Sequence, residues 1–471
     1  MNYMFWDILF AVLFVAGVSA FLYTKRRKLK REGLLFLYHT SFGLKLIDHV
    51  GKKYHKTLKV ASHVSVWLGY ALMGIMVWMF GRIVWIYAFH SDVVKAIKMP
   101  PIMPLIPYLP QMFKLDFLPP FYFSYWIVIL AIIAITHEFF HGIFAATNNV
   151  KTKTTGFGFF PFFFPVFLAA FVNLDEKKME KTGNFKQRAV LSAGTFANSL
   201  TAIIGILLMW GFFALTFSPV GITYDDHAYN IVNITDIDTI NGVPIDWTHS
   251  NFSEIEDLGR LNKIAIGNLT YSAVKGYTPY PGKIALYYEA PAITSNLTNI
   301  ITTIDGKTIN TLNGLTETLS AYSPGEVITI GSYDKYKDEF FEVNVTLAEN
   351  PIDSEKAWLG ISFTDKTPTN FVGKVTQLTT AYKTPNVYYH PNFGAAKFIY
   401  DLLWWLVLIS FSVALVNMLP MGIFDGGRFF YLTVKKITGS EKAGEKAYAW
   451  MTNLLLLMVA VVMVFWAINL F

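Results

Sequence analysis

The sequence of 471 residues contains no cysteine. Disulfide bonds and thiolate metal sites are therefore excluded, and any metal site has to use histidine, aspartate or glutamate side chains. Charged residues are also scarce, at 15% of the chain, whereas 53% of the residues are hydrophobic and 17% are aromatic. This balance, with its positive mean hydropathy, is typical of a multi-pass membrane protein and not of a soluble one.

A strong excess of positive charge is missing as well, since the net charge is only +6. The basic residues collect in loops beside apolar segments, which fits contact with a lipid bilayer better than binding to nucleic acid. We therefore expect no nucleic-acid partner.

The apolar residues form six runs, each long enough for a spanning helix, which needs about 20 mostly apolar residues. No cleavage site of small residues follows the first run, so we interpret it as a retained helix and not as a signal peptide. The six runs cover roughly residues 4–23, 62–90, 121–147, 189–217, 397–418 and 447–470.

The basic loops predict how the helices are oriented. The segment KRRKLKR at 25–31 and the lysines that follow it up to Lys59 favour a cytoplasmic loop, because short loops rich in Lys and Arg tend to stay inside. The N-terminus then lies outside, and counting the crossings returns 151–188 to the cytoplasm. By the same count the polar segment 218–395 lies outside the cell membrane.

The polar segment 218–395 contains 20 acidic and 11 basic residues and five N-x-S/T sequons, which are compatible with an extracytoplasmic position. The sequons begin at Asn233, Asn251, Asn268, Asn296 and Asn344.

The same segment contains an internal repeat, in which TING at 239–242 and TIDG at 303–306 each predict a strand, a tight turn and a second strand. The second copy continues with a short helix, a Pro-Gly turn and alternating strands. This order resembles a PDZ domain, with the first copy a partial or diverged second one. An unrelated small β-rich domain remains an alternative interpretation for each copy.

Two apolar segments are too rich in proline for regular helices. The segment MPPIMPLIPYLP at 99–110 predicts an extended stretch at the outer surface, because each proline removes a backbone donor. Residues 156–176, interrupted by Pro161 and Pro165, predict a re-entrant hairpin packed beside the active helices. Its Phe162–Phe164 stretch lies where an extended substrate could pair with a strand edge.

The motif HEFFH lies within the third apolar run. His137 and His141 are four residues apart and so share one helical face, on which they can bind one zinc ion, and Glu138 between them suits a general base. Ionisable groups inside a spanning helix are costly unless they are paired or coordinated, so hydrogen-bonding histidines are the weaker explanation.

Zinc needs a third protein ligand if one position is to stay open for water. The fifth apolar run ends in NMLPMGIFDGGR at 417–428, which contains Asp425. By the predicted orientation both runs point inward, so their polar ends reach a similar depth on the cytoplasmic side. We therefore predict that Asp425 joins His137 and His141.

The two motifs together resemble the site-2 protease family of intramembrane zinc metalloproteases, in its six-span, PDZ-containing form. The resemblance rests on H-E-x-x-H at 137–141 and on the N-x-x-P-x-x-x-x-D-G pattern from Asn417 to Gly426. It covers roughly residues 99–440 and implies a polytopic α-helical membrane fold with an extracytoplasmic β-rich PDZ-like domain. Phe140 and Phe424 depart from the residues commoner in the family, and Phe140 puts substrate access in question.

The resemblance implies one zinc ion held by His137, His141 and Asp425, with Glu138 taking a proton from a water molecule and later protonating the leaving amine. It implies transmembrane protein substrates, cleaved in regulated intramembrane proteolysis, and peptide segments bound at the PDZ-like domain. Asn417 is the better candidate for holding the substrate backbone and Asn198 the second, although a helix–helix hydrogen bond explains Asn198 equally well.

The expected organisation has four parts. They are two N-terminal helices with a basic cytoplasmic loop (1–98), the first half of the catalytic core (99–217), the extracytoplasmic domain (218–395), and the second half of the core with the last helix (396–471).

Two other classes of function remain open. A non-catalytic membrane receptor or scaffold would use the PDZ-like domain to bind peptides and keep the metal as a structural ion. A metal transporter would need polar residues along several helices, whereas here they gather at one depth on two.

Overall fold

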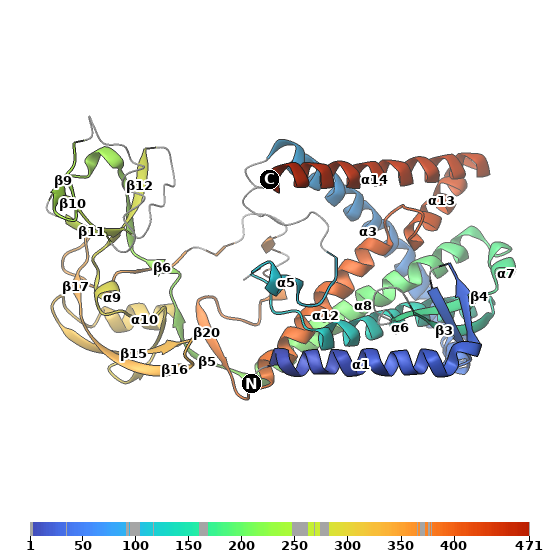
Figure 1. The fold of residues 1–471 in the computed structure, drawn as a ribbon, viewed down its shortest axis with the longest axis horizontal. Helices are drawn as coiled ribbons and strands as arrows, with labels where there is room; N and C mark the ends of the chain where they lie inside the picture. The colour runs from blue at the N-terminus through green and yellow to red at the C-terminus, as the bar shows by residue number, and fades with distance from the viewer. Residues whose placement is uncertain are drawn as a thin grey trace. The chain divides into compact units, whose positions relative to one another are not determined.

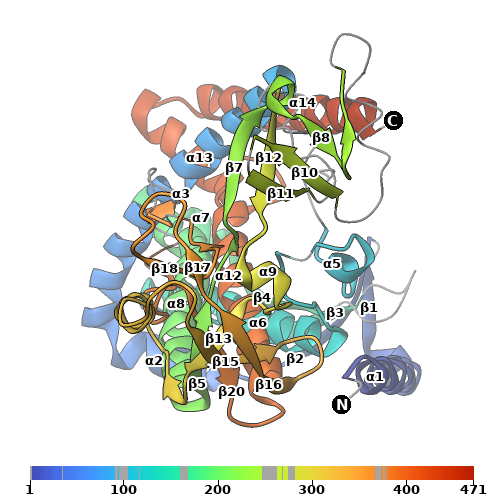
Figure 2. The same ribbon diagram turned by 90° about the vertical axis from the view of Figure 1, so that its left-hand side faces the viewer.

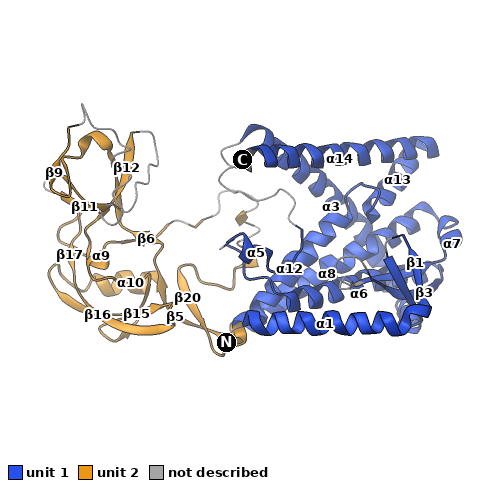
Figure 3. Ribbon diagram, viewed as in Figure 1, with its two compact units in different colours: residues 1–212, 397–471 blue, residues 213–396 orange. Residues whose placement is uncertain are grey.

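The computed structural model describes most of the chain, in two compact units (Figure 3). Unit 1 comprises residues 1–212 and 397–471, and unit 2 comprises residues 213–396. The described residues are 3–33, 35–90, 94, 104–115, 117–159, 168–246, 262–267, 269–273, 282–364, 366–367, 373–374, 377 and 379–470.

Among these residues, six helices are long and apolar enough to cross a membrane, as predicted (Figure 1). They are α1 (Tyr3–Lys25), α3 (His55–Phe89), α6 (Phe123–Thr147), α8 (Asn184–Thr216), α12 (Ala396–Asn417) and α14 (Glu441–Leu470). The multi-pass architecture and the inserted β-rich region are therefore confirmed.

Unit 1 also contains a small antiparallel sheet in the order β1-β2-β3-β4. Its strands are β1 (Leu29–Glu32), β2 (Leu35–Thr40), β3 (Thr152–Phe159) and β4 (Leu168–Leu174). The predicted hairpin at 156–176 is therefore present as β3 and β4, while Phe162–Phe164 lie outside the described residues. Pairing of β2 with β3 joins segments more than a hundred residues apart, and it turns part of the basic loop into sheet.

Short helices complete unit 1. They are η1 (Arg26–Lys28), α2 (Leu44–Lys53), α5 (Leu109–Met112), α7 (Glu176–Glu180) and α13 (Asp425–Thr438). In the proline-rich stretch predicted to be extended, residues 104–108 are not helical, whereas Leu109 begins α5; residues 99–103 lie outside the described part.

Polar contacts join α8 to α3 and to α13. The hydroxyls of Ser65 and Ser192 are 2.7 Å apart, and the Asn184 side-chain amide donates to the Leu432 carbonyl at 2.8 Å. Around these contacts lies an apolar core whose fully buried members include Phe144 and Phe429. The packing places α13, which starts at Asp425, against the helices that carry the other site residues.

Asp7 fixes the start of α6, although α1 is otherwise mostly exposed. Its buried carboxylate accepts hydrogen bonds from the backbone N–H groups of Phe123 at 2.7 Å and Ser124 at 2.9 Å, and from the Tyr108 hydroxyl at 2.5 Å. The first N–H groups of a helix have no partner within it. Asp7 therefore caps α6 from a neighbouring helix.

Unit 2 contains two larger sheets (Figure 2). The first has the order β7-β12-β11-β10-β8-β9, with β7 (Tyr229–Asn233), β8 (Thr239–Ile240), β9 (Val243–Pro244), β10 (Asn262–Ile266), β11 (Leu269–Ala273) and β12 (Lys283–Tyr288). The second has the order β16-β15-β13-β5-β20, with β14 paired to β13. Its strands are β5 (Phe217–Thr223), β13 (Ile300–Ile304), β14 (Lys307–Thr308), β15 (Val327–Asp334), β16 (Glu339–Thr346) and β20 (Val387–Pro391).

Smaller elements border these sheets. They are η2 (Ile234–Asp236), α9 (Pro291–Thr294), α10 (Leu312–Leu319) and the paired short strands β6 (Asp226–His227) with β19 (Ile361–Ser362) and β17 (Ala348–Glu349) with β18 (Ala357–Trp358).

Both halves of the predicted repeat form tight hairpins. Asn241 and Gly242 have φ values of 51° and 79°, and Asp305 and Gly306 have values of 45° and 77°. Positive φ at both central residues defines the hairpin turn that Asn-Gly and Asp-Gly favour. The repeated TING and TIDG sequences therefore encode the same turn in each sheet.

Candidate metal centre

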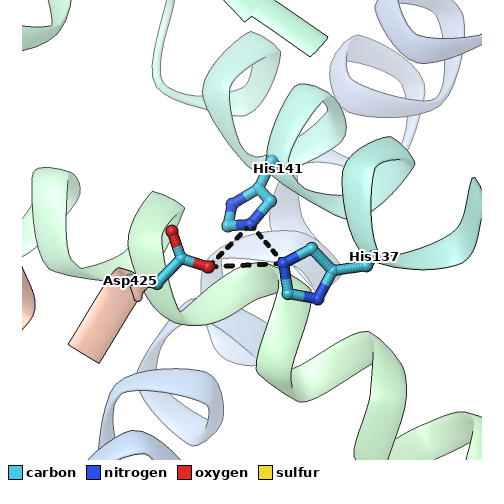
Figure 4. A group of neighbouring side chains, drawn as sticks. All are labelled: His137, His141 and Asp425. Carbon is cyan, nitrogen blue, oxygen red and sulfur yellow. Dashed lines mark hydrogen bonds and ion pairs between the residues drawn. The ribbon is translucent and has the colours of Figure 1, made fainter. Parts of the chain in front are cut away.

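The two histidines of HEFFH lie one turn apart on α6 and point toward the same space (Figure 4). His141 is 9% exposed, and its Nδ1 lies 2.7 Å from the Val190 carbonyl oxygen. A carbonyl only accepts hydrogen bonds, so Nδ1 carries the proton and Nε2 keeps a lone pair. The Nε2 atom faces His137 Nε2 at 3.0 Å, so both histidines present this nitrogen to one point.

Asp425 reaches that point from α13 because the chain turns sharply after α12. α12 ends at Asn417, and Pro420 cannot continue a helix. A Cβ at Gly426 or Gly427 would overlap the backbone of residues 418–421. The glycine pair thus lets α13 start directly against this turn.

The three donor atoms form a nearly regular triangle. Asp425 Oδ2 lies 3.3 Å from His137 Nε2 and 3.2 Å from His141 Nε2 (Figure 4). A tetrahedral zinc ion with ligands at about 2.0–2.2 Å places its donors roughly 3.3 Å apart. The triangle therefore fits one zinc ion with a fourth position left for water, and these three residues are the metal-binding group found among the described residues.

The helix opposite leaves room for the two rings. A Cβ at Gly194 on α8 would lie 2.5 Å from His141 Nε2 and would overlap the His137 ring. Gly194 was not singled out from the sequence. In SAGTFANS its spacing alone does not distinguish it from an ordinary helix-packing glycine.

Asn198, one turn further along α8, lies against His137. Its Nδ2 is 3.0 Å from His137 Nδ1, and the residue is fully buried. Its Oδ1 has no hydrogen-bond partner within the described part of the chain. If the Asn198 amide is rotated by 180°, its Oδ1 accepts a hydrogen bond from a protonated Nδ1 of His137. Nε2 of His137 then keeps its lone pair for a metal ion. Asn417 is further away, with Nδ2 at 3.5 Å from the same nitrogen.

Glu138 lies beside the triangle and does not join it. Its Oε2 accepts a hydrogen bond from the Val172 backbone N–H on β4 at 2.9 Å. Glu138 also lines, with His141 and Asp425, a cavity of about 270 Å³. The cavity gives this carboxylate and the open side of the triangle a shared space.

Charged side chains border the same cavity away from the triangle. They are Glu176 at the start of α7 and Arg428, one turn after Asp425 on α13. Arg428 also lies 4.0 Å from Glu180. These groups are compatible with water in the cavity.

The sequence model of peptidase family M50 matches residues 125–461, which contain every residue of the triangle. The chain belongs to peptidase family M50. It is an intramembrane zinc metalloprotease, and the His137–His141–Asp425 cluster suits its one metal ion. A comparison with curated proteins gives no match.

Membership in M50 implies protein substrates and a multi-pass membrane protein.

Proposed function

We propose that this M50 peptidase hydrolyses peptide bonds within or near the transmembrane segments of membrane proteins, in regulated intramembrane proteolysis. The observation that carries the proposal is the donor triangle of His137, His141 and Asp425. Two of its members, His141 and Asp425, line one cavity together with Glu138. All four side chains come from helices within unit 1.

The residues divide the chemistry between them. His137, His141 and Asp425 would hold a zinc ion, which would supply a Lewis acid and would lower the pKa of a bound water towards about 7. Glu138 takes a proton from the water whose oxygen adds to the scissile carbonyl carbon, and it gives that proton to the amine nitrogen as the C–N bond breaks. Its place beside the ligands, and not among them, suits this role.

We assign Asn198 to the orientation of His137 and not to the substrate. The residue is fully buried and its amide lies on the ring nitrogen opposite the metal-facing one, which is how partners of metal ligands fix the ring and its tautomer. Asn417 is only partly buried and more distant from His137, so it stays our candidate for holding the substrate backbone.

We also propose that the active site lies towards the cytoplasmic side and that unit 2 is extracytoplasmic. The support is the basic segment 25–31 and the lysines at 177–186, since short loops rich in Lys and Arg remain inside.

For unit 2 we propose that a groove beside α10 binds an extended peptide, in the manner of a PDZ domain. The groove has a volume of about 330 Å³ and lies between α10 and residues 357–363. Leu315 and Leu319 of α10 line one side, and Ile361 and Phe363 line the other. An apolar groove of this kind selects an extended ligand by the side chains at alternate positions along it.

A binding measurement tests this role. Leu319→Asp in the full chain should weaken binding of peptides selected on the wild type at least tenfold, whereas Glu317→Gln on the exposed side of α10 should not. Equal binding by the two variants would show that the peptide does not bind in this groove.

Cleavage is tested with purified, zinc-loaded protein and candidate membrane proteins in detergent, with products read by mass spectrometry. The wild type should release fragments cut in or next to a transmembrane segment, and Glu138→Gln should release none while retaining zinc. Full cleavage by Glu138→Gln would contradict the mechanism. A wild type that binds zinc and peptides but cuts no substrate would favour the receptor or scaffold.

A further inference from the structure

Helix α2 has one face that packs on the helix bundle and one basic face that does not. Ile47 and Gly51 are buried, whereas Lys45, His49 and Lys52 are exposed. With about 3.6 residues per turn, these three exposed side chains lie roughly opposite Ile47 on the helix. α2 therefore turns an apolar side inward and a polar, mostly basic side outward.

The inward side holds α2 against the last turns of α6. A Cβ at Gly142 would lie 2.9 Å from the Ile47 side chain, and a Cβ at Gly51 would lie 2.7 Å from the Ala146 side chain. The Thr147 hydroxyl lies 3.2 Å from the Gly51 carbonyl oxygen. Since α6 ends at Thr147, α2 lies beside the end of a spanning helix, where the hydrocarbon of a bilayer gives way to lipid headgroups.

Positive charge continues from α2 into the start of α3. Residues 41–60 contain five lysines, all of them exposed, and a single carboxylate, that of Asp48. Within the described part of the chain, none of these lysines forms an ion pair with a carboxylate. The five are Lys45, Lys52, Lys53, Lys56 and Lys59. Their charge is therefore available to a partner outside the chain.

Large apolar side chains are exposed among these lysines. Phe42, just before α2, is 74% exposed, Leu46 is 54% exposed, and Tyr54, between α2 and α3, is 50% exposed. Leu46 lies seven residues before Lys53, so the two share one flank of α2. Apolar and basic residues side by side are typical of a helix that lies in the plane of a bilayer surface. A free anion would leave these apolar groups in water.

We propose that α2 and the start of α3 bind the headgroups of anionic phospholipids at the bilayer surface. The lipid phosphates pair with the exposed lysines, and Phe42 and Leu46 enter the apolar layer beside them. Each lysine near an anionic membrane surface raises the affinity roughly fivefold. Among the described residues that line the metal cavity, none belongs to this surface. The proposal therefore goes beyond the proposed function and does not depend on it.

A label on the outer face of α2 tests which lipid lies there. The chain has no cysteine, so His49→Cys gives one labelling site, between Lys45 and Lys52. A fluorophore at this site, in the full chain in phosphatidylcholine vesicles, is quenched by spin-labelled lipid that comes close to it. At low salt, spin-labelled phosphatidylglycerol should quench at a roughly tenfold lower mole fraction than spin-labelled phosphatidylcholine. High salt should reduce this preference, because it screens exposed charges.

Two matched pairs of substitutions show whether the lysines of α2 cause the preference. Lys45→Gln with Lys52→Gln should reduce the preference for phosphatidylglycerol roughly fivefold or more. Lys442→Gln with Lys446→Gln near the start of α14 is the control, since both lysines are exposed and each directly follows a glutamate. The control should keep the preference of the labelled parent.

Glycerol phosphate separates a lipid site from a site for free phosphate. At millimolar concentration it should leave the quenching unchanged, because it offers nothing to the apolar side chains beside the lysines. Equal quenching by the two lipids, an equal loss in the two double variants, or relief of the quenching by glycerol phosphate would each overturn the proposal. Zinc binding and cleavage by the wild type would in those cases leave the proposed function intact.

Discussion

Gly194 and His137 face each other across the α8–α6 contact, and the His137 ring occupies the space that any side chain at Gly194 would need. The same Cβ would lie 2.5 Å from His141 Nε2, well inside the 3.4 Å at which ordinary contact begins. One glycine therefore decides whether both histidines can turn toward Asp425.

Replacing Gly194 with alanine should abolish zinc binding, because the added methyl group displaces both metal-facing nitrogens. Two measurements should fall together: the zinc content that remains after dialysis, and the rate at which a membrane substrate is cleaved. Gly211→Ala is the matched control, since Gly211 lies on the same helix with open space around its Cβ position. A Gly194→Ala variant with a full zinc complement would contradict this account of the helix contact.

Asn198→Ala should weaken zinc binding by about 10- to 100-fold, the usual effect of removing the partner of a metal-binding histidine. The affinity is measured by competition with a chelator. Ser199→Ala on the same helix should bind zinc as the wild type does, because the Ser199 hydroxyl donates to the Thr195 carbonyl and not to a ligand. If Asn198 instead contacts the substrate alone, zinc affinity will not change and only KM will rise.

The Asp7 cap predicts a graded loss of stability. Asp7→Ala leaves the N–H groups of Phe123 and Ser124 and the Tyr108 hydroxyl without their acceptor, and an unsatisfied buried donor costs about 1–3 kcal/mol. Asp7→Asn retains one acceptor oxygen, and Tyr108→Phe removes only one of the three bonds.

The midpoint of thermal unfolding in detergent should therefore fall least for Tyr108→Phe, more for Asp7→Asn and most for Asp7→Ala. Ser19→Ala, elsewhere on α1, provides the control. Equal midpoints for Asp7→Ala and Ser19→Ala would show that α6 does not depend on this cap.

His227 predicts a pH-dependent stability in unit 2. Burial lowers the pKa of His227, and the neighbouring Asp226 carboxylate only partly opposes the shift. Above about pH 6.5, the pKa of histidine in an unfolded chain, both states are neutral and the stability is fully present. As the pH falls from there towards the lower folded pKa, the unfolded chain binds a proton that the folded chain does not yet bind, and stability is lost.

Hydrogen exchange in the full chain, corrected for the intrinsic effect of pH on exchange, measures the local stability around His227. The strand pair β6 and β19, which contains His227, should lose protection between pH 7 and pH 5, and His227→Gln should flatten the change. Protection of the pair that stays constant in the wild type would refute the assignment.

Much of the fold and of the metal site was predictable because each rests on a strong local pattern. Spanning helices follow from the length of apolar runs, and HEFFH fixes two ligands by helical spacing alone. Asp425 could be added from a distance of almost three hundred residues, because a charged residue at matching depth in a membrane protein has few alternative explanations.

What the sequence did not show depends on contacts between distant segments. The pairing of β2 with β3 needs no special residue in either strand. Asp7 appears in the sequence as a lone carboxylate in an apolar run, and only the packing of α1 on α6 reveals its three donors. Gly194 matters because it has no side chain, and Val172 contributes its backbone N–H. Neither property can be recognised from the residue type alone.

The most direct test of the account is a zinc titration of the metal-free wild type, with cleavage of one membrane substrate measured at each step. The His137–His141–Asp425 triangle predicts that the rate rises with zinc and stops rising at one equivalent, and that Asp425→Asn gives neither tight binding nor cleavage. Cleavage by the metal-free protein, or full cleavage by zinc-treated Asp425→Asn, would contradict the central claim.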